Sequence, residues 1–375
     1  MGENAQANFR RLVSRFLNQV EYARELSDES PFFPQHIHIE PTNSCNLRCI
    51  HCIQDSMTRK RGVMEWDVFT KVMDEIAPLG CSITLDVQGE PMLHPRCLDM
   101  VEYAKSNGCH VSLLTNATRL NEEAARRLID LKLDRVVFSF DAIDKELYEK
   151  IRVKADFDKV FRNILRFVDL NYQAGRPTFI CASIILQEAT VDHLQAYKEY
   201  FNALPVNTIF VSNLLNMSGG SEVSGEIDLT GKKATPKADW PICRVPWENL
   251  TVNWDGSVCN CPLDYNLSVP VGDVKKQTLQ EIWNSEPVRA FRRAHLRHDY
   301  SGVETRGKLC SECNCLWDPE YDLRRFKEFA TEAIVRQARH FAASLIENQA
   351  ESGDTPDEEA KYRKLQDELR RINAA

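Results

Sequence analysis

The sequence predicts an α/β protein built on a parallel β-sheet, and three observations support this fold class. Short apolar runs alternate with longer helical patterns from residue 36 to residue 213. Six strand patterns follow one another with a helical pattern between each and the next, and strands joined in this way pair in parallel through right-handed crossovers. The 375 residues are 43% hydrophobic and 27% charged, which is typical of a globular protein with a large core. Periodicity alone does not separate a closed barrel from an open sheet.

Each expected element follows from the spacing of its apolar residues. The expected strands lie at 36–41, 82–88, 110–115, 135–141, 178–186 and 207–213. The segments between them show helical spacing, and the expected helices lie at 65–77, 95–107, 121–131, 157–172 and 190–203. Apolar residues at helical spacing over 9–20 predict a further amphipathic helix before the first strand.

The chain divides into segments by composition. A stretch rich in Ser, Gly, Lys and Thr follows the last expected strand and reads as a linker. Helical patterns near the C-terminus end in an amphipathic stretch, 362–372, which is expected to cap the core, with binding of a partner as the alternative. We therefore expect an N-terminal helical segment at 1–35, the α/β domain at 36–215, the linker at 216–242, a cysteine-bearing module at 243–318 and a helical tail at 319–375.

Charge and composition exclude several classes of protein. The net charge of −8 argues against a nucleic-acid-binding protein that works through a generally basic surface. The sequence shows no signal peptide and no apolar run long enough for a membrane span, so a cytoplasmic protein without a membrane partner is expected. Thiols stay reduced in the cytoplasm, and the thirteen cysteines are therefore not expected to form disulfides.

Three cysteines follow the first expected strand in a C-x3-C-x2-C loop, formed by Cys45, Cys49 and Cys52. Three thiolates can hold three irons of a [4Fe–4S] cube and leave the fourth iron open for another ligand. A structural zinc site is the alternative, but such sites close with four ligands. His51 could complete that set, although its place between two cysteines would strain the loop.

This loop resembles the signature of the radical S-adenosylmethionine (SAM) superfamily, in which the loop ends the first strand of a partial (β/α)6 barrel. The resemblance implies a [4Fe–4S] cluster that binds SAM at its open iron, with His51 standing where an aromatic residue is commonest.

Gln88-Gly-Glu-Pro91 resembles the family's GGEP motif, with Gln88 in place of the first glycine. The resemblance implies SAM contacts at other strand ends too, and the full set is Gln88, Gly89, Glu90, Pro91, Thr115, Asn116, Ser139 and Arg152. A plain structural role is the alternative at Thr115, Asn116, Ser139 and Arg152. The active site is expected at the carboxyl ends of the strands.

A second group of cysteines lies beyond the linker, at Cys243, Cys259, Cys261, Cys310, Cys313 and Cys315. Two ligands near a hairpin and two from a distant C-x2-C suit a cubane or tetrahedral site, so iron–sulfur and zinc both fit. The pattern resembles the SPASM/twitch extension of radical SAM enzymes. Since the further cysteine run of a full SPASM domain is absent, the resemblance implies one auxiliary [4Fe–4S] cluster. Its expected ligands are Cys243, Cys261, Cys310 and Cys313, with Cys259 and Cys315 as spares, either of which could replace a neighbour.

The resemblance implies a function as well. A radical SAM enzyme splits SAM to a 5′-deoxyadenosyl radical that removes a hydrogen atom from its substrate, and it needs an external one-electron reductant such as flavodoxin or ferredoxin. The C-terminal pattern resembles that of twitch-type aminocyclitol dehydrogenases. Oxidation of a secondary alcohol on a sugar- or cyclitol-like small molecule in natural-product biosynthesis is therefore the first hypothesis.

Two other hypotheses stay open. Modification of a peptide or protein, as by peptide maturases, epimerases or sulfatase-maturing enzymes, is the second. The short segment before the barrel and the single auxiliary cluster weigh against it. An electron-carrying iron–sulfur protein without catalytic activity is the third. The general base and the substrate cannot be identified from the sequence, and the basic run Thr58-Arg-Lys-Arg61 is expected to be a solvated surface or a site for a substrate phosphate.

Overall fold

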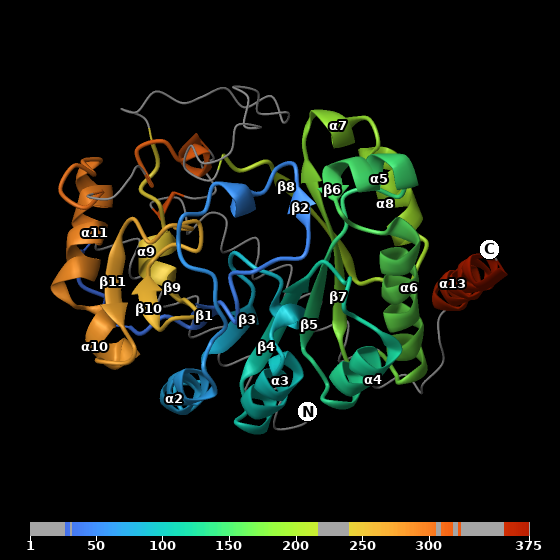
Figure 1. The fold of residues 1–375 in the computed structure, drawn as a ribbon, viewed down its shortest axis with the longest axis horizontal. Helices are drawn as coiled ribbons and strands as arrows, with labels where there is room; N and C mark the ends of the chain where they lie inside the picture. Colours follow the sequence, from blue (N-terminus) through green and yellow to red (C-terminus); the bar gives the residue numbers. More distant parts are fainter. Residues whose placement is uncertain are drawn as a thin grey trace.

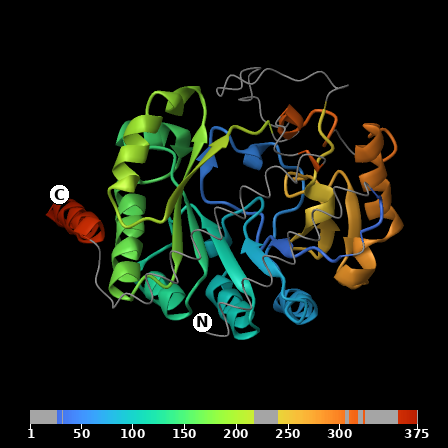
Figure 2. The same ribbon diagram turned by 180° about the vertical axis from the view of Figure 1, so that it is seen from behind.

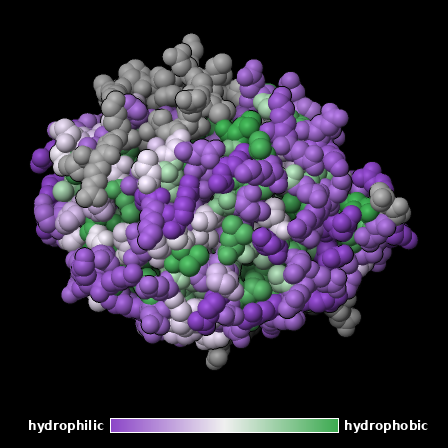
Figure 3. Space-filling model, in the orientation of Figure 1, coloured by the Kyte–Doolittle hydropathy of each residue, from purple (hydrophilic) through white to green (hydrophobic). Residues whose placement is uncertain are grey.

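The computed structural model describes residues 27–30, 32–216, 240–304, 309–317, 322–323 and 356–374. The helix expected over 9–20, most of the linker and the helical pattern between the cysteine module and the C-terminal helix lie outside these ranges. No helix in the described ranges is both long and apolar enough to span a bilayer. On the face shown in Figure 3, apolar side chains are scattered among hydrophilic ones.

Six parallel strands form the centre of the molecule, and all six match the expected strands. They are β1 (His36–Ile39), β3 (Ser82–Leu85), β4 (His110–Thr115), β5 (Arg135–Ser139), β7 (Phe179–Leu186) and β8 (Thr208–Asn213). They pair in the order β1-β3-β4-β5-β7-β8. The outer strand β8 pairs with β7 but not with β1, so the sheet is a partial barrel as the resemblance implied.

Helices cover the outer face of this sheet (Figure 1). They are α2 (Trp66–Ile76), α3 (Cys97–Ser106), α4 (Glu122–Asp130), α5 (Lys145–Ile151), α6 (Phe157–Gln173), α7 (Glu188–Val191) and α8 (Leu194–Asn202). The helix expected over 190–203 is therefore two helices. The break has a local cause, because the Thr190 hydroxyl donates back to Ile185 O at 2.8 Å and accepts from Gln187 N at 2.9 Å. This bonding completes a one-turn helix before α8 begins.

Side chains on the strands alternate between the helix-covered face and the inner face. Ile37 and Ile39 of β1 are fully buried in the core, whereas His36 and His38 point to the inner face. The same alternation places Ser82 and Thr84 of β3 beside the two histidines. The inner face of this part of the barrel is therefore polar.

The cysteine module extends the same sheet. Its elements are α9 (Val245–Glu248), β9 (Asn249–Val252), β10 (Ser257–Cys259), β11 (Pro270–Asp273), α10 (Leu279–Trp283), α11 (Glu286–Arg297) and η4 (Asn314–Trp317). Strand β9 pairs in parallel with β1, and β10 and β11 continue the sheet as an antiparallel edge. The sequence did not predict this junction, which sets the module directly beside the first strand of the barrel.

The C-terminal helix α13 (Pro356–Ala374) packs on α6 at the end of the molecule opposite the cysteine module (Figures 1 and 2). Leu365 is fully buried in the main core, and the rings of Tyr172 and Tyr362 stack with centroids 4.0 Å apart. The expectation that this stretch caps the core is confirmed.

Candidate active site

The loop that carries Cys45, Cys49 and Cys52 begins directly after β1. A two-stranded ladder holds its middle, since β2 (Arg48–Cys49) pairs antiparallel with β6 (Arg152–Val153) and places Cys49 opposite Arg152. The short helix η1 (Ile53–Asp55) follows Cys52. Leu47 N donates to Cys45 Sγ at 3.4 Å. The three thiols thus lie in one fixed loop at the carboxyl end of the barrel.

The segment from Gln88 to Pro91 lies against this loop. Strand β3 ends earlier than expected because Val87 has a φ of 76°, a conformation that is strained for a β-branched residue. Gly89 then passes so close to the cysteine loop that a Cβ atom would lie 2.0 Å from Thr42 O. Glu90 N donates to Ser44 O at 2.9 Å. Only glycine at position 89 permits this approach, which packs the GGEP-like motif on the cysteine loop.

The buried Glu90 carboxylate joins this motif to the end of β4. It accepts hydrogen bonds from Thr115 Oγ1 at 2.7 Å, from Asn116 N at 2.7 Å and from Met92 N at 3.1 Å, the last in η2 (Pro91–Leu93). The Asn116 side-chain amide lies 3.8 Å from Cys45 Sγ. Residues predicted from two separate strand ends are therefore brought together beside the first cysteine.

Arg152 approaches the same loop from the other side. Its guanidinium forms an ion pair of 2.8 Å with the buried Asp141 and lies 3.8 Å from Cys49 Sγ. Burial lowers the pKa of His51 to about 4, so this ring is neutral beside the pair. Ser139 is the last residue of β5 and lies two residues before Asp141 in the sequence.

These residues fit an iron–sulfur cluster better than a single ion. No three His, Cys, Asp or Glu side chains in the described ranges come together closely enough to hold one metal ion. In a cubane each cysteine binds a different iron, so its ligands stand farther apart than ligands around one zinc. Burial raises the pKa of Cys49 to about 11, so the free thiol is protonated and loses its proton when iron binds. Amide and guanidinium groups beside two of the thiols suit a thiolate-bound cluster.

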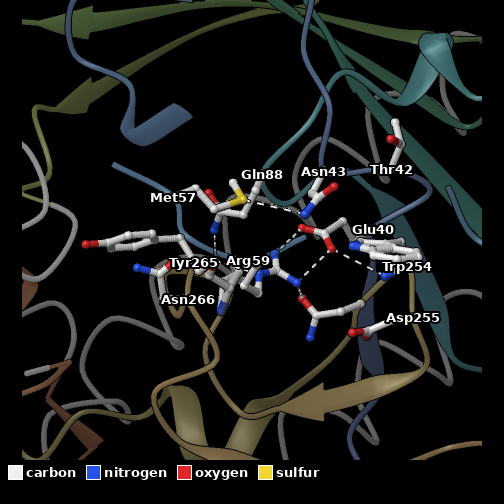
Figure 4. A network of polar contacts seen from close by, with 12 residues as sticks. Glu40, Thr42, Asn43, Met57, Arg59, Gln88, Trp254, Asp255, Tyr265 and Asn266 are labelled. Carbon is white, nitrogen blue, oxygen red and sulfur yellow. Dashed lines mark hydrogen bonds and ion pairs between the residues drawn. The ribbon is translucent and has the colours of Figure 1, made fainter. Parts of the chain in front are cut away.

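One residue of the basic run after the cysteine loop, Arg59, is not solvated, which corrects the expectation at that position, whereas Thr58, Lys60 and Arg61 are exposed as expected. The Arg59 side chain is 8% exposed and that of Glu40 is fully buried, and the two form an ion pair of 2.7 Å (Figure 4). Arg59 also donates to Tyr265 O at 2.6 Å and to Asn253 Oδ1 at 3.1 Å. Arg59 therefore links the cysteine loop and β1 to the cysteine module.

Gln88 makes a second link between the two parts of the chain. Its side-chain amide donates to Pro262 O at 2.6 Å, and Pro262 follows Cys261 directly. The Gln54 side chain donates to Gln88 O, and Arg61 donates to Gln54 Oε1 at 2.7 Å. A glycine at position 88 could not reach Pro262 with a side chain.

The second cysteine group surrounds a cavity of about 180 Å³ in the module. All four cysteines expected as ligands line it, namely Cys243, Cys261, Cys310 and Cys313. Cys315 lines it too, whereas Cys259 points elsewhere, with its sulfur 3.7 Å from the Asn253 side-chain amide. The remaining lining is mostly apolar. A mostly apolar cavity edged by five thiols fits an iron–sulfur cluster.

Two histidines that sequence reasoning did not single out lie in these regions. His38 forms a hydrogen-bonded pair with Asp86, with Nδ1 2.9 Å from Oδ2, on the inner face of the barrel. His295 is 1% exposed and lines the cysteine cavity. The alternation of polar and apolar residues along β1 could have placed His38 on the inner face of the barrel. No local feature of the sequence, however, could have paired it with Asp86. Nothing local to α11 could have placed His295 beside cysteines.

Comparison with protein families agrees with this geometry. Residues 39–194 match the radical SAM superfamily, and residues 243–314 match the SPASM iron–sulfur cluster-binding domain. A tungsten-containing aldehyde ferredoxin oxidoreductase cofactor-modifying protein of Pyrococcus furiosus is 25% identical over 69% of this chain and 83% of its own length. A mycofactocin maturase of Mycobacterium tuberculosis is 24% identical over 55% of this chain, which spans about half the length of that relative.

Solved structures share the fold at low sequence identity. BtrN in complex with AdoMet and 2-DOIA superposes with a TM-score of 0.52 at 17% identity, over 78% of this chain and 98% of BtrN. SuiB of Streptococcus suis, bound to its precursor peptide SuiA, superposes with a TM-score of 0.58 at 13% identity, over 83% of this chain and 74% of SuiB. A radical SAM domain carries a [4Fe–4S] cluster and SAM, and a SPASM domain carries auxiliary iron–sulfur clusters. The chain therefore carries a radical SAM domain at residues 39–194, followed by a SPASM iron–sulfur cluster-binding domain at residues 243–314.

Proposed function

We propose that this enzyme oxidises a secondary alcohol on a sugar- or cyclitol-like small molecule, with an auxiliary cluster in the cysteine cavity as the electron acceptor. The observation that carries the proposal is the 2.6 Å bond from Gln88 to Pro262 O. It joins the motif proposed to hold SAM to the loop that follows a cavity cysteine. A short connection of this kind suits a reaction in which an electron leaves the substrate radical for a second cluster.

The proposed ligands are Cys45, Cys49 and Cys52 for the first cluster and Cys243, Cys261, Cys310 and Cys313 for one auxiliary cluster. Cys315 is a candidate replacement because it lines the same cavity, and Cys259 is not, because it lies outside it. Proposed SAM contacts come from the assembled strand ends, namely Gln88–Pro91, Thr115, Asn116, Ser139 and Arg152. Since Glu90 already accepts three protein hydrogen bonds, we assign it mainly to holding Thr115 and Asn116 in place.

When bound, the first cluster and SAM supply a 5′-deoxyadenosyl radical. That radical would take one hydrogen atom from the alcohol carbon. The substrate hydroxyl would give its proton to a base of the protein, and an auxiliary cluster held by the cavity cysteines would accept the remaining electron. The alcohol carbon becomes a carbonyl, so the substrate loses two hydrogen atoms in all. A protein base facing the barrel interior is therefore required.

We assign the base to His38. Burial lowers the pKa of the His38 imidazole, but the neighbouring Asp86 charge and its hydrogen bond outweigh that effect and raise it overall. Asp86 Oδ2 accepts from Nδ1 at 2.9 Å, which leaves Nε2 with its lone pair free to take a proton. Both side chains lie on the polar inner face of the barrel. In the sequence, His38 is two residues before Glu40, and Asp86 is two residues before Gln88. This arrangement orients the ring and stabilises its protonated form.

Peptide modification is the second candidate function, and the names of the relatives favour it. One relative is a mycofactocin maturase, and SuiB was crystallised with a precursor peptide. A further relative modifies the cofactor of another oxidoreductase, as its name states.

The deciding experiment is a turnover assay under anaerobic conditions. The reconstituted full-length enzyme is reduced with dithionite or with flavodoxin and its reductase, given SAM, and offered panels of cyclitols, sugars and candidate peptides. Our proposal predicts a carbonyl product two hydrogen atoms lighter than its cyclitol or sugar substrate, with one 5′-deoxyadenosine formed per product. A modified peptide in place of a small-molecule product would overturn it and support the second candidate.

A further inference from the structure

His295 is a buried polar residue with no part in the chemistry above. It lies in the last turn of α11, is 1% exposed, and reaches the cavity lined by the cysteines. A polar ring buried in a mostly apolar cavity needs hydrogen-bond partners, because an unpaired buried group costs about 1–3 kcal/mol. The contacts of its two ring nitrogens therefore indicate what the ring does.

Each ring nitrogen of His295 faces one partner. Nε2 lies 3.4 Å from Cys310 Sγ, and Nδ1 lies 3.4 Å from the hydroxyl oxygen of Tyr300. The ring meets those of Phe291 and Tyr300 edge-on, with both centroid distances at 5.0 Å. These aromatic neighbours fix the plane of the imidazole and aim Nε2 at the sulfur.

The two partners select one tautomer. A neutral imidazole donates from one nitrogen and accepts at the other. An iron-bound Cys310 is a thiolate, which accepts but cannot donate, so the ring proton sits on Nε2 and Nδ1 accepts from the Tyr300 hydroxyl. The hydrogen bond that results runs from Nε2–H to the sulfur of Cys310.

The backbone around Cys310 makes this donor more important. In many iron–sulfur loops the backbone amides donate to cysteine sulfur, and such bonds raise the reduction potential. Here the Glu304 carboxylate accepts from Leu309 N at 3.0 Å, from Ser311 N at 2.9 Å and from Cys310 N. The loop amides are thus turned toward a carboxylate, whose negative charge opposes reduction of a nearby cluster.

We propose that His295 is a positioning residue that sets the reduction potential of the auxiliary cluster by donating a hydrogen bond to the Cys310 thiolate. The inference rests on the proposed function, in that a cluster bound by Cys310 occupies the cavity. The N–H donor withdraws charge from the sulfur and favours the reduced, more negative cluster. Such a bond makes the cluster a better acceptor for the electron that leaves the substrate radical, and Glu304 acts in the opposite direction.

The test is an EPR-monitored redox titration of the auxiliary cluster. It uses the full-length chain with Cys45, Cys49 and Cys52 all changed to Ala, reconstituted anaerobically, so that the signal arises from the second site alone. In this background, His295→Leu removes the donor, His295→Gln keeps an amide donor of similar reach, and His298→Gln changes a neighbouring histidine that does not line the cavity. Iron and sulfide content is measured for each variant.

We expect His295→Leu to shift the midpoint potential to a more negative value, His295→Gln to restore part of that shift, and His298→Gln to leave it unchanged. Tyr300→Phe should shift it in the same direction as His295→Leu by a smaller amount, because Nδ1 then loses its hydrogen-bond donor. An unchanged potential in His295→Leu with full cluster content would overturn the proposal.

A spectroscopic measurement covers the case in which His295→Leu does not assemble a cluster. ENDOR on the reduced cluster, with ¹⁵N-labelled histidine and after exchange into D₂O, should show a weak nitrogen coupling and an exchangeable hydrogen near the cluster. A strong nitrogen coupling would show that His295 binds iron directly, and no coupling at all would show that it does not approach the cluster. Either result would overturn the proposal. If the background variant binds no iron, the proposed function itself fails, which is a separate outcome.

Discussion

The side-chain amide of Gln88 donates to the carbonyl oxygen of Pro262 at 2.6 Å, so the GGEP-like motif of the barrel is bonded to the loop that follows Cys261. The segment that packs on the first cysteine group is thereby bonded directly to the loop beside the second. A glycine, which the family's motif has at this position, offers no such bond. The departure from the motif therefore has a structural consequence in this chain.

Gln88→Ala should loosen this connection without preventing SAM cleavage. We expect the free energy of unfolding to fall by about 0.5–1.5 kcal/mol, the usual net worth of one hydrogen bond. Product formed per 5′-deoxyadenosine should fall several-fold, because the substrate radical loses its electron less efficiently. Product and 5′-deoxyadenosine are both quantified by mass spectrometry. The control is Gln195→Ala, at an exposed position of α8. A wild-type ratio in Gln88→Ala would show that the bond has no part in coupling.

Gly89→Ala should disrupt the cysteine loop. The added Cβ would lie 2.0 Å from Thr42 O and 2.8 Å from Ser44 O, and backbone atoms cannot move aside cheaply. We expect a loss of at least about 1–3 kcal/mol of stability, typical of overpacking, and a loss of the first cluster. Gly302→Ala is the matched control, because a Cβ there has no neighbour within 4 Å. Equal iron content in both variants would contradict this account.

Arg59→Met should destabilise the protein strongly at neutral pH. The change leaves the Glu40 carboxylate buried without its partner, which costs about 3–5 kcal/mol for a buried pair. Chemical denaturation measures the effect. The double variant Glu40→Gln/Arg59→Met should recover much of the loss, whereas Arg126→Met, which breaks an exposed pair, should lose little.

The Arg59→Met variant should also show a characteristic pH dependence. Burial raises the pKa of Glu40, and loss of the Arg59 charge raises it further. A carboxyl group whose pKa is raised in the folded state destabilises that state once the pH exceeds this pKa. The loss of unfolding free energy in Arg59→Met should therefore shrink at low pH, where Glu40 is protonated. A deficit that is the same at every pH would show that packing, not charge, accounts for the loss.

The His38–Asp86 pair makes a prediction about turnover. If His38 accepts the substrate proton, the rate should rise as the pH rises through its raised pKa, because only the neutral ring can act. Asp86→Asn removes the nearby charge and should shift that rise to lower pH. The ring centroids of His36 and His38 are 4.8 Å apart, so His36 is kept unchanged in the wild type and in Asp86→Asn.

His38→Gln should lower product formation on the order of 10²- to 10⁴-fold, the range of general base catalysis, while 5′-deoxyadenosine continues to form. The two rates are measured separately over a pH series with the substrate found in the turnover assay. Identical pH profiles for the wild type and Asp86→Asn, with full activity in His38→Gln, would exclude His38 as the base.

The sequence was sufficient to predict the six barrel strands and the cysteine groups, because apolar periodicity and cysteine spacing are local signals. It also predicted that Cys243, Cys261, Cys310 and Cys313 come together, since the structure places all four around one cavity. It did not predict how β9 pairs with β1, because strand pairing between distant segments leaves no local trace.

The errors have the same physical origin. The basic run at Thr58–Arg61 looked solvated because each residue is polar, yet Arg59 is buried by partners at Glu40 and Asn253, far away in sequence. His295 and His38 were missed because their roles depend on the cysteine and the carboxylate that the fold brings to them. Long-range contacts decide the function of such residues.

The most direct test of the central claim, that two separate cluster sites lie in this chain, is iron quantification with Mössbauer spectroscopy after anaerobic reconstitution. The account predicts about eight irons per wild-type chain in two [4Fe–4S] clusters. Changing Cys45, Cys49 and Cys52 to Ala should leave about four, and so should changing Cys243, Cys261, Cys310 and Cys313. A wild-type chain with about four irons, all lost with the first cysteine group, would contradict it.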